Sequence, residues 1–393
     1  MAIPVLLAAT ATQYIGTARI PGALAANGFD VSLLAPRETL AETSRHIGRI
    51  EHLSDDTTPR QWAHAFAAMV EAVSPRIVLA CDDTAQRLLQ AIALSPPDDM
   101  PPTLRLRLAA LVRASLGAPE HYRTSVDKTL LPPAAAALGI RVPPYAVVSE
   151  IEELVDFSGR HGFPVVLKRA FGAAGEWVEI ANDRRQLAAA HAKLASAVTL
   201  EVEGAASRSL LAQAHVSGVI RNQNVAAWQG QMLAGFVREK MVAHPPPMGP
   251  STVNRYLHSA ETQDFAERLV RGLGMSGLFG IEFIADRDSG AAYLLEINRR
   301  ITPGTPTGAL VGVDLCAALR AVIDEVPNAS RTRLDDGEEH VIAQFPQEWL
   351  RDPGSAYLRD CRVDAPWNDP RLFAAMLALR PRPQRSAVGT SPH

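Results

Sequence analysis

Short apolar segments alternate with helical patterns at the start of the chain, and this alternation limits the fold more than any other feature. The segments follow one another in the order Ile3–Ala9, Ala18–Asn27, Val31–Leu34, Trp62–Val73 and Ile77–Ala80, the second and fourth being helical. Strands joined by helices become parallel neighbours, with the helices packed on the faces of the sheet. The start of the chain is therefore predicted to be an open α/β lobe.

The loop after the first strand argues against one common use of such a lobe. Rossmann-like domains that bind dinucleotides carry a GxGxxG pattern there, whereas Thr10–Gly16 contains a single glycine. Asp82 and Asp83 follow the strand Ile77–Ala80, at the edge where open sheets bind ligands. A helix N-cap explains the same pair. We predict a Rossmann-like domain over residues 1–122 that is not a dinucleotide site.

The pattern changes after a proline-rich break. Prolines at 132–133 and 143–144 bracket a short alanine-rich helix, and short strands mixed with helices follow from Tyr145. These patterns predict a small α+β unit over residues 123–208 and a larger one over residues 209–330. Residues 331–393 would form a C-terminal extension, with a helix at Pro370–Leu379 and a disordered end after Arg380.

Charge and cysteine content narrow the class of protein. The 39 lysines and arginines against 42 acids give a formal net charge of −3, which argues against a dedicated nucleic-acid or anionic-membrane binder. The three cysteines are far apart and predict neither a disulfide framework nor a metal knuckle. The apolar run at the start is too short for a membrane span. We expect a cytoplasmic protein with no nucleic-acid or membrane partner.

Three side chains that carry oxygen ligands are expected to gather on one hairpin. Glu282 lies in one strand-like run, Glu296 and Asn298 lie in the next, and a turn around Asp286–Gly290 separates them. Residues two apart share a strand face, and a hairpin register would bring Glu282 beside the other two. Oxygen ligands of this kind favour Mg²⁺ or Mn²⁺. The alternative without a function is the solvated polar face of an edge hairpin.

Two further positions add positive charge to this pattern. Arg300 lies two residues beyond Asn298, so it would share the metal face and stabilise a transferring phosphate or a carboxylate. Arg299 would point away and act only as a surface charge. Upstream, the strand Phe163–Lys168 ends in a lysine, followed by small residues whose backbone amides could cover phosphate: Gly172, Ala173, Ala174 and Gly175. An ordinary hairpin turn explains that loop equally well.

The order of these residues along the chain resembles the ATP-grasp superfamily. The resemblance covers roughly 124–324 and rests on Lys128, Lys168 with its loop, Glu282 and the segment Glu296–Arg300. It implies two subdomains that hold ATP between them, with the lysines on the phosphates, Gly172–Gly175 covering them, and Glu282, Glu296 and Asn298 holding Mg²⁺ ions. A hinge strand would receive adenine through Gln213, Ala214, His215 and Val216.

The resemblance also implies a reaction. An ATP-dependent ligase would convert a carboxylate to an acylphosphate and join it to an amine, with Arg300 and Lys168 as catalytic residues. Gly280 stands where D-alanine:D-alanine ligases typically carry arginine, so that activity is disfavoured. A carboxylase, a carbamoyl-phosphate-type enzyme and a non-catalytic ATP-binding regulator stay open. Small carboxylates and amines are the expected partners, and the resemblance is compatible with a homodimer.

Overall fold

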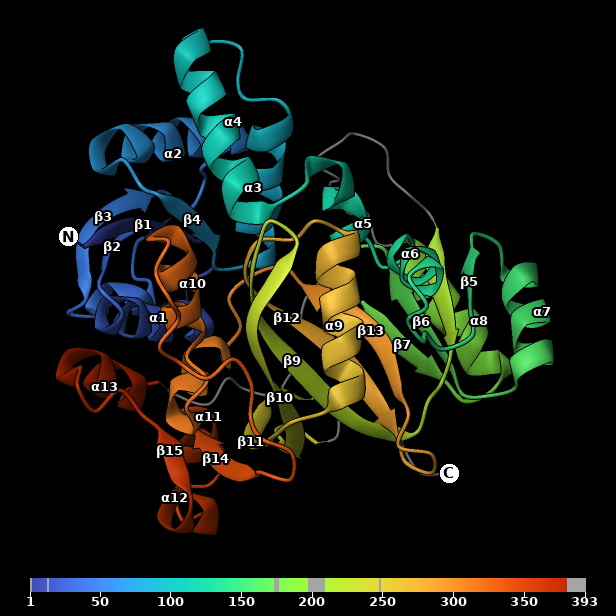
Figure 1. Ribbon diagram of the computed structural model, residues 1–393. Helices are drawn as coiled ribbons and strands as arrows, with labels where there is room; N and C mark the ends of the chain where they lie inside the picture. Colours follow the sequence, from blue (N-terminus) through green and yellow to red (C-terminus); the bar gives the residue numbers. More distant parts are fainter. Residues whose placement is uncertain (1, 13, 173–176, 197–208, 247–248, 380–393) are drawn as a thin grey trace.

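The computed structural model describes residues 2–12, 14–172, 177–196, 209–246 and 249–379 of the 393-residue chain. Figure 1 shows three regions side by side: a blue N-terminal lobe, a central region and a green small lobe. Ala173, Ala174 and Gly175 of the expected phosphate loop lie outside the described residues, as does the end of the chain after Leu379. The predicted α/β lobe followed by mixed α+β units is confirmed.

The first lobe is built on a four-stranded parallel sheet of order β3-β2-β1-β4. Its strands are β1 (Ile3–Ala8), β2 (Phe29–Pro36), β3 (Ile47–Leu53) and β4 (Ile77–Ala80). Alternate residues of the central strand enter different cores, because Leu7 packs on one face of the sheet and Leu6 on the other. An unbroken apolar run is therefore the signature of a strand that is covered on both faces.

Helices cover both faces of this sheet. Helix α1 packs on one face, while α2, α3 and α4 pack on the other. Thr58 begins α2 with a capping box, and Asp82 begins α3 by accepting the N–H of Ala85. The helices of this part of the chain are α1 (Ile15–Ala26), η1 (Leu40–Thr43), α2 (Pro59–Val73), α3 (Asp83–Leu94), α4 (Pro102–Leu116), η2 (Pro119–His121), α5 (Tyr122–Val126) and α6 (Leu131–Ala137).

The small lobe has its own antiparallel sheet and its own core. The strands β5 (Tyr145–Val148), β6 (Val165–Arg169), β7 (Val178–Ala181) and β8 (Leu210–Ala214) are ordered β5-β8-β6-β7, and α7 (Ile151–His161) and α8 (Arg184–Ser196) cover one face. We expected the small unit to end at residue 208. Instead β8 pairs with β5 and β6, so its sheet extends to Ala214.

A seven-stranded sheet forms the centre of the molecule, in the order β13-β12-β9-β10-β11-β14-β15. We expected residues 331–393 to form an extension, but β14 pairs with β11 and β15 with β14, so part of this segment completes the sheet. The elements are β9 (Gly218–Trp228), β10 (Gln231–Ala243), β11 (Ser251–Leu257), α9 (Ala260–Gly272), β12 (Gly277–Asp286), β13 (Ala292–Asn298), η3 (Thr305–Val311), α10 (Leu315–Ile323), β14 (His340–Gln344), α11 (Gln347–Arg351), α12 (Ala356–Asp360), β15 (Arg362–Asp364) and α13 (Pro370–Leu377).

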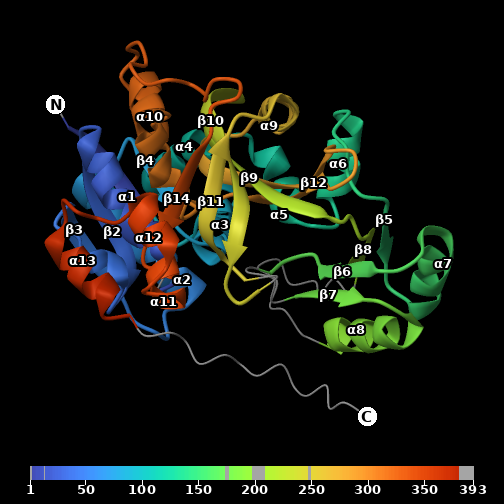
Figure 2. The same cartoon turned by 90° about the horizontal axis from the view of Figure 1, so that it is seen from below.

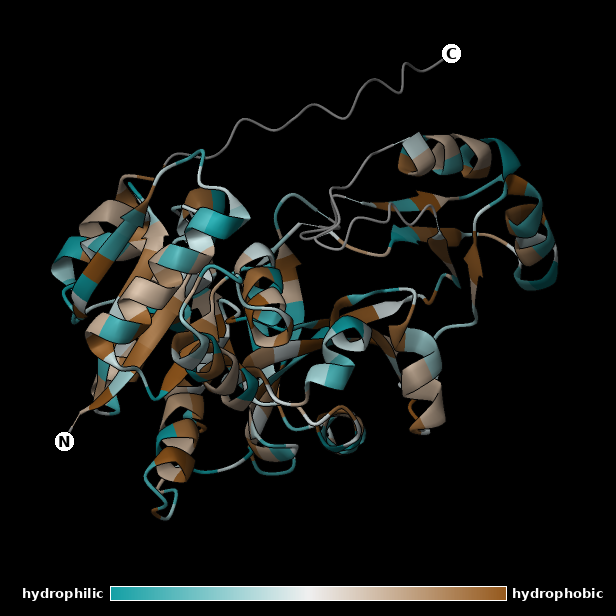
Figure 3. Ribbon diagram, turned by 90° about the horizontal axis from the view of Figure 1, so that it is seen from above, coloured by the Kyte–Doolittle hydropathy of each residue, from teal (hydrophilic) through white to brown (hydrophobic). Residues whose placement is uncertain are grey.

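The cores show which regions are fused. Leu7 and Leu33 of the first lobe share one cluster with Phe236, Tyr256 and α10, so the first lobe and the large sheet are packed as one body. The small lobe has a separate cluster beneath α7 and α8. Figure 3 shows apolar residues concentrated on the strands of each region. In the described residues, no single helix is long and apolar enough to cross a membrane.

Candidate active site

The two expected metal carboxylates lie directly opposite each other. Glu282 on β12 pairs with Glu296 on β13 across the antiparallel ladder, and Glu282 also pairs with Asn222 on β9. Opposite residues on adjacent strands point to the same face of a sheet. Gly280 pairs with Asn298 in the same way, so Asn298 joins this polar face. The register therefore brings together all three oxygen ligands predicted from the sequence.

The other face of the same strands is apolar, which fixes the direction of the acids. Ile281, Phe283 and Ile297 pack in the cluster beneath α9. Because side chains alternate along a strand, the acids must point away from α9. Gly280 leaves room on the polar face, since a Cβ there would lie 2.9 Å from Asn222 Oδ1 and 2.9 Å from Thr302 Cγ2.

Two lysines approach this polar face from the other side. Lys128 follows α5, and its Nζ lies 3.3 Å from Glu296 Oε2 and donates to the carbonyl of Gly172 at 2.7 Å. Lys168, on β6, is only 7% exposed. It lies on the face of the small sheet opposite to α7 and α8, since its neighbours Leu167 and Val165 pack beneath those helices. In Figure 2, α8 lies on one side of β6 and β7, and β12 lies on the other.

The charges of this cluster act on one another. Burial and, after it, the neighbouring charge of Glu296 raise the pKa of Glu282 to about 7, against the opposing lysines, Lys240 among them. Burial alone would also raise the pKa of Glu296, but Lys128 and Lys168 outweigh it and the pKa is lowered. Burial lowers the pKa of Lys168, against the attraction of Glu296. Two acids and two lysines thus face each other across the junction between the units.

The residues present fit a divalent cation. Glu282 and Glu296 are acceptor-only when ionised, and the buried Oδ1 of Asn222 beside Glu282 has no hydrogen-bond partner among the described residues. Hard oxygen donors of this kind suit Mg²⁺ or Mn²⁺. The described residues hold no cluster of three or more His, Cys, Asp or Glu. A cation here would therefore be held by two acids with amide oxygens.

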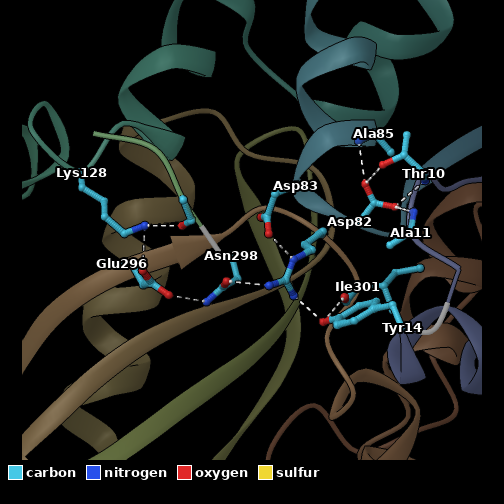
Figure 4. Close-up of polar contacts among 12 residues, drawn as sticks. Thr10, Ala11, Tyr14, Asp82, Asp83, Ala85, Lys128, Glu296, Asn298 and Ile301 are labelled. Atoms are coloured by element: carbon cyan, nitrogen blue, oxygen red, sulfur yellow. Dashed lines mark hydrogen bonds and ion pairs between the residues drawn. The ribbon is translucent and has the colours of Figure 1, made fainter. Parts of the chain in front are cut away.

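Arg300 joins this cluster to the first lobe. Its Nη2 donates to Asn298 Oδ1 at 3.2 Å, and Asn298 Nδ2 donates to Glu296 Oε1 at 3.3 Å. On its other side, Arg300 Nε donates to Asp83 Oδ2 at 3.0 Å, and Nη1 donates to the hydroxyl of Tyr14. Figure 4 shows this continuous chain of polar contacts from Lys128 to Tyr14. The guanidinium is therefore held on both sides beside the acids.

Arg299 corrects one expectation. We predicted that it would point away from the metal face, and it does, but it is no surface charge. It is 5% exposed, its guanidinium lies 4.9 Å from the ring of Phe279, and it donates to the carbonyl of Leu116. Burial lowers its pKa to about 10. The alternation of a strand places adjacent arginines in different environments.

The acidic pair after β4 has two separate roles. Asp82 is the N-cap of α3, which was the alternative to a ligand site in the sequence analysis. It also accepts the N–H of Thr10 at 2.6 Å and of Ala11 at 3.0 Å. Its neighbour Asp83 is the partner of Arg300. One acid therefore fixes the β1–α1 loop and the other reaches the candidate site.

The expected adenine contacts lie at the end of β8. The N–H groups of Ala214 and His215 donate to the carbonyls of Pro144 and Pro164, so both are engaged within the chain. Gln213 is 2% exposed, and its Nε2 is buried with no partner among the described residues. It shares a face with Lys168, because Lys168 pairs with Leu211 two residues away. Gln213 is therefore a better candidate than Ala214 and His215, whose N–H groups are already engaged.

Comparison with known proteins identifies the arrangement. Residues 126–304 match the family model of the ATP-grasp domain. This part of the chain is an ATP-grasp domain. Pyruvate carboxylase 1 of Caenorhabditis elegans is 26% identical over 249 residues, covering 60% of this chain and 19% of the relative. The carbamoyl phosphate synthase large chain of Thermus thermophilus is 26% identical over 256 residues, covering 58% and 23%. The chain thus spans less than a quarter of either relative.

Solved structures share the ATP-grasp fold over most of the chain. The biotin carboxylase domain of Hydrogenobacter thermophilus 2-oxoglutarate carboxylase, solved with MgADP and bicarbonate, gives a TM-score of 0.64 at 16% identity and covers 87% of this chain and 74% of that one. N5-carboxyaminoimidazole synthetase of Staphylococcus aureus, solved with ADP, gives 0.63 at 10%, covering 87% and 82%. L-amino acid ligase of Bacillus licheniformis gives 0.60 at 14%, covering 86% and 79%.

The structure adds three residues to this candidate site that the sequence did not reveal. Asn222 comes from β9, Tyr14 from the β1–α1 loop, and Lys240 from β10, where its Nζ donates to the carbonyl of Gly249 at 3.1 Å. None lies in a motif. The polar residues Asn222 and Asn224, two apart in a strand-like run, were the one signal that could have marked a second polar strand.

Proposed function

We propose that this chain is an ATP-dependent ligase that activates a carboxylate and joins it to an amine. A carboxylate oxygen of the substrate attacks the γ-phosphorus of ATP, the bond to the β,γ-bridging oxygen breaks, and ADP leaves. The amine nitrogen then attacks the acyl carbon of the acylphosphate, phosphate leaves with the bonding electron pair, and the nitrogen releases a proton. The products are an amide, ADP and phosphate.

The residues of the site divide these tasks between them. Phosphoryl transfer needs positioning and charge neutralisation rather than a protein nucleophile. Lys128 and Lys168 would bind the phosphate oxygens, and Arg300, held by Asp83 and Tyr14, would stabilise the transferring group and the acylphosphate oxygen. Glu282, Glu296 and Asn298 would hold Mg²⁺, which neutralises phosphate charge when it is bound.

One observation carries the proposal. Two acids in register, an amide and a fixed guanidinium lie on one sheet face opposite two lysines from other elements. A solvated hairpin would not need Lys168 to be 7% exposed and close enough to Glu296 for their charges to attract. Buried opposing charges of this kind are arranged for a charged substrate that enters between them.

A second candidate is supported by the neighbours. Pyruvate carboxylase 1, the 2-oxoglutarate carboxylase domain and N5-carboxyaminoimidazole synthetase are carboxylases or carboxylating enzymes by name, so bicarbonate is an alternative acid for the same first step. A non-catalytic ATP-binding regulator is the third candidate function.

The oligomeric state is a separate expectation. The 2-oxoglutarate carboxylase domain was solved as a dimer, and we expect a homodimer here, which light scattering measures.

One assay separates these functions. Purified protein with ATP and Mg²⁺ is supplied with pooled carboxylic acids and amines, with bicarbonate and amines, or with neither, while ADP and phosphate are measured. The ligase predicts ADP release that needs both an acid and an amine, and mass spectrometry then identifies the amide. ADP release with bicarbonate alone as the acid favours a carboxylase. Nucleotide binding without ADP release in any mixture contradicts both enzymes and favours the regulator.

Arg300→Lys tests the role of the guanidinium. Lysine keeps the charge but cannot contact Asp83, Tyr14 and Asn298 together, so kcat should fall about a hundredfold or more while ATP affinity is kept. Arg221→Lys is the matched control, because Arg221 precedes Asn222 on β9 and pairs with Glu239 on the opposite face. An unchanged kcat in Arg300→Lys would remove Arg300 from the reaction.

A further inference from the structure

A cavity of about 710 Å³ lies in the first lobe, beside the candidate active site. Its walls come from the carboxyl ends of β1, β2 and β3 and from the first turns of α2 and α3. In an open α/β sheet, the crevice outside the carboxyl ends of the strands is where ligands bind, at the point where the strand order reverses. Here that point is β1, which has β2 on one side and β4 on the other.

The cavity contains a cation, Arg87, that forms no hydrogen bond or ion pair with the described residues. Helix α3 presents Thr84, Arg87 and Leu88 to it, at the i, i+3 and i+4 positions of one helix face. Among the residues that the structure describes, Arg87 makes no hydrogen bond or ion pair, and its Nε is buried without a partner. Asp55, the acid of the lining, is exposed and does not pair with it. An arginine in such a position fits a carboxylate of a ligand.

About half of the other lining residues are apolar, and they lie beside hydroxyl groups and Asp55. Trp62 is 2% exposed and stacks on Phe66 with ring centroids 5.6 Å apart, so its indole forms a fixed flat wall. Leu53 and Leu88 are buried beside it. A ligand that fits this cavity therefore combines an anionic group with an apolar body.

Two contacts connect the cavity to the reacting groups. Tyr14 lines it, and the hydroxyl of Tyr14 accepts a hydrogen bond from Arg300. Arg87 lies 6.0 Å from the ring centroid of Phe171, the residue before Gly172, whose carbonyl accepts from Lys128. A ligand held by Arg87 would thus share the cavity with Tyr14, which contacts Arg300, and would lie near Phe171 at the start of the phosphate loop.

We infer that this cavity binds the amine substrate, and that this amine is an amino acid with an apolar side chain whose carboxylate is bound by Arg87. The inference rests on the proposed ligase function, since it names the acceptor of that reaction. The carboxylate at Arg87 leaves the amino group free to face Tyr14 and Arg300. Bidentate recognition of a carboxylate is lost when an uncharged amide replaces it.

Direct binding tests the cavity without nucleotide. Saturation-transfer NMR compares leucine, methionine and phenylalanine with leucinamide, methioninamide and phenylalaninamide, each added to the full chain. The wild-type protein should bind the acids between about tenfold and a hundredfold more tightly than the amides. Arg87→Ala should abolish this preference and Arg87→Lys should keep part of it. Arg76→Ala is the control, because Arg76 is exposed before β4, at the opposite edge of the sheet.

Turnover then separates the cavity from the ligase. In the ADP assay, Arg87→Ala should raise the KM for the amino acid by a similar factor, with kcat and the affinity for ATP unchanged. Equal binding of acids and amides by the wild type, or a preference that survives in Arg87→Ala, overturns the cavity assignment. So does turnover that is as fast with amines that lack a carboxylate. Selective binding of the acids without any ADP release supports the cavity and overturns the ligase.

Discussion

At the scale of single residues, two acids side by side on adjacent strands set the chemistry of the site. Like charges placed directly opposite each other destabilise a sheet, and burial adds the cost of desolvation. The chain offsets this cost with Lys128 and Lys168 but does not remove it, since the pKa of Glu282 is raised to about 7. The site without its ligands therefore works against the stability of the fold.

Glu282→Gln should make the metal-free protein more stable at alkaline pH. The carboxyl of Glu282 has a pKa of about 7 in the folded chain and 4.5 ordinarily, so the folded state binds the extra proton between those values. Wild-type stability should therefore fall as pH rises through that window and level off above it. The variant lacks this fall and should gain on the order of 2 kcal/mol at pH 8, with little change at pH 4. Urea unfolding at several pH values measures this.

Glu338→Gln supplies a control of opposite sign. Arg331 and His340 lower the pKa of half-buried Glu338 to about 2, so its contribution is present above the ordinary pKa and is lost as pH falls towards 2. This variant should lose stability at neutral pH. If Glu282→Gln were also less stable than the wild type at pH 8, the raised pKa of Glu282 would be wrong.

At the scale of elements, a helix cap also holds a loop. The carboxylate of Asp82 caps α3 by accepting the N–H of Ala85, and it also accepts the N–H groups of Thr10 and Ala11. One carboxylate thus joins α3 to the β1–α1 loop that carries Tyr14. Hydrogen bonds to a charged group are the stronger ones in proteins. Losing this cap would loosen both the helix and the loop.

Asp82→Ala should lower stability by roughly 2–4 kcal/mol and raise the KM of the amine substrate. The change in KM follows because the loop lines the proposed amine cavity. Asp314→Ala is the matched control: Asp314 caps α10 through Cys316 and Ala317 and also accepts from Asn27 Nδ2, and Asn27 lies at the amino edge of the sheet. It should lose comparable stability without a change in KM. An equal rise in KM in both variants would show that general destabilisation is the cause.

The elements also show how far the sequence could predict the molecule. The hairpin of β12 and β13 and its polar face were predictable, because strand alternation and the turn between the strands are local features. The position of β8 was not, because nothing local decides which of two sheets an apolar strand will join. Asn222, Lys240 and Tyr14 reach the site through strand pairing and packing between residues far apart in the chain. The sequence predicted ligands within one segment and missed those that only the tertiary fold supplies.

At the scale of the whole molecule, the site lies between two bodies that do not share a core. The first lobe and the large sheet form one body, and the small lobe has its own cluster beneath α7 and α8. Lys168 belongs to the small lobe, whereas Glu282 and Glu296 belong to the large sheet. A ligand that binds both sides would therefore stabilise their contact.

Magnesium and ADP should raise the Tm of the chain. A ligand at a hundredfold excess over its Kd stabilises the folded state by about 2.7 kcal/mol. Lys168→Met should lose most of this gain, because the lysine is expected to contact phosphate. Lys193→Met is the control, since Lys193 on α8 pairs with Glu179 on β7 and its side chain is 60% exposed. Thermal unfolding with and without MgADP measures both, and an equal rise in Tm in Lys168→Met would exclude Lys168 from nucleotide binding.

The anchoring of Arg300 has a consequence for engineering by domain exchange. Arg300 follows the last strand of the metal hairpin, but two of its partners, Tyr14 and Asp83, belong to the first lobe. A chimera that takes its first lobe from another member of the superfamily must bring a hydroxyl and an acid to these two positions. Otherwise it will join two well-folded parts and leave the guanidinium without a fixed orientation. Compatibility between exchanged parts can therefore be screened at two residues before any gene is built.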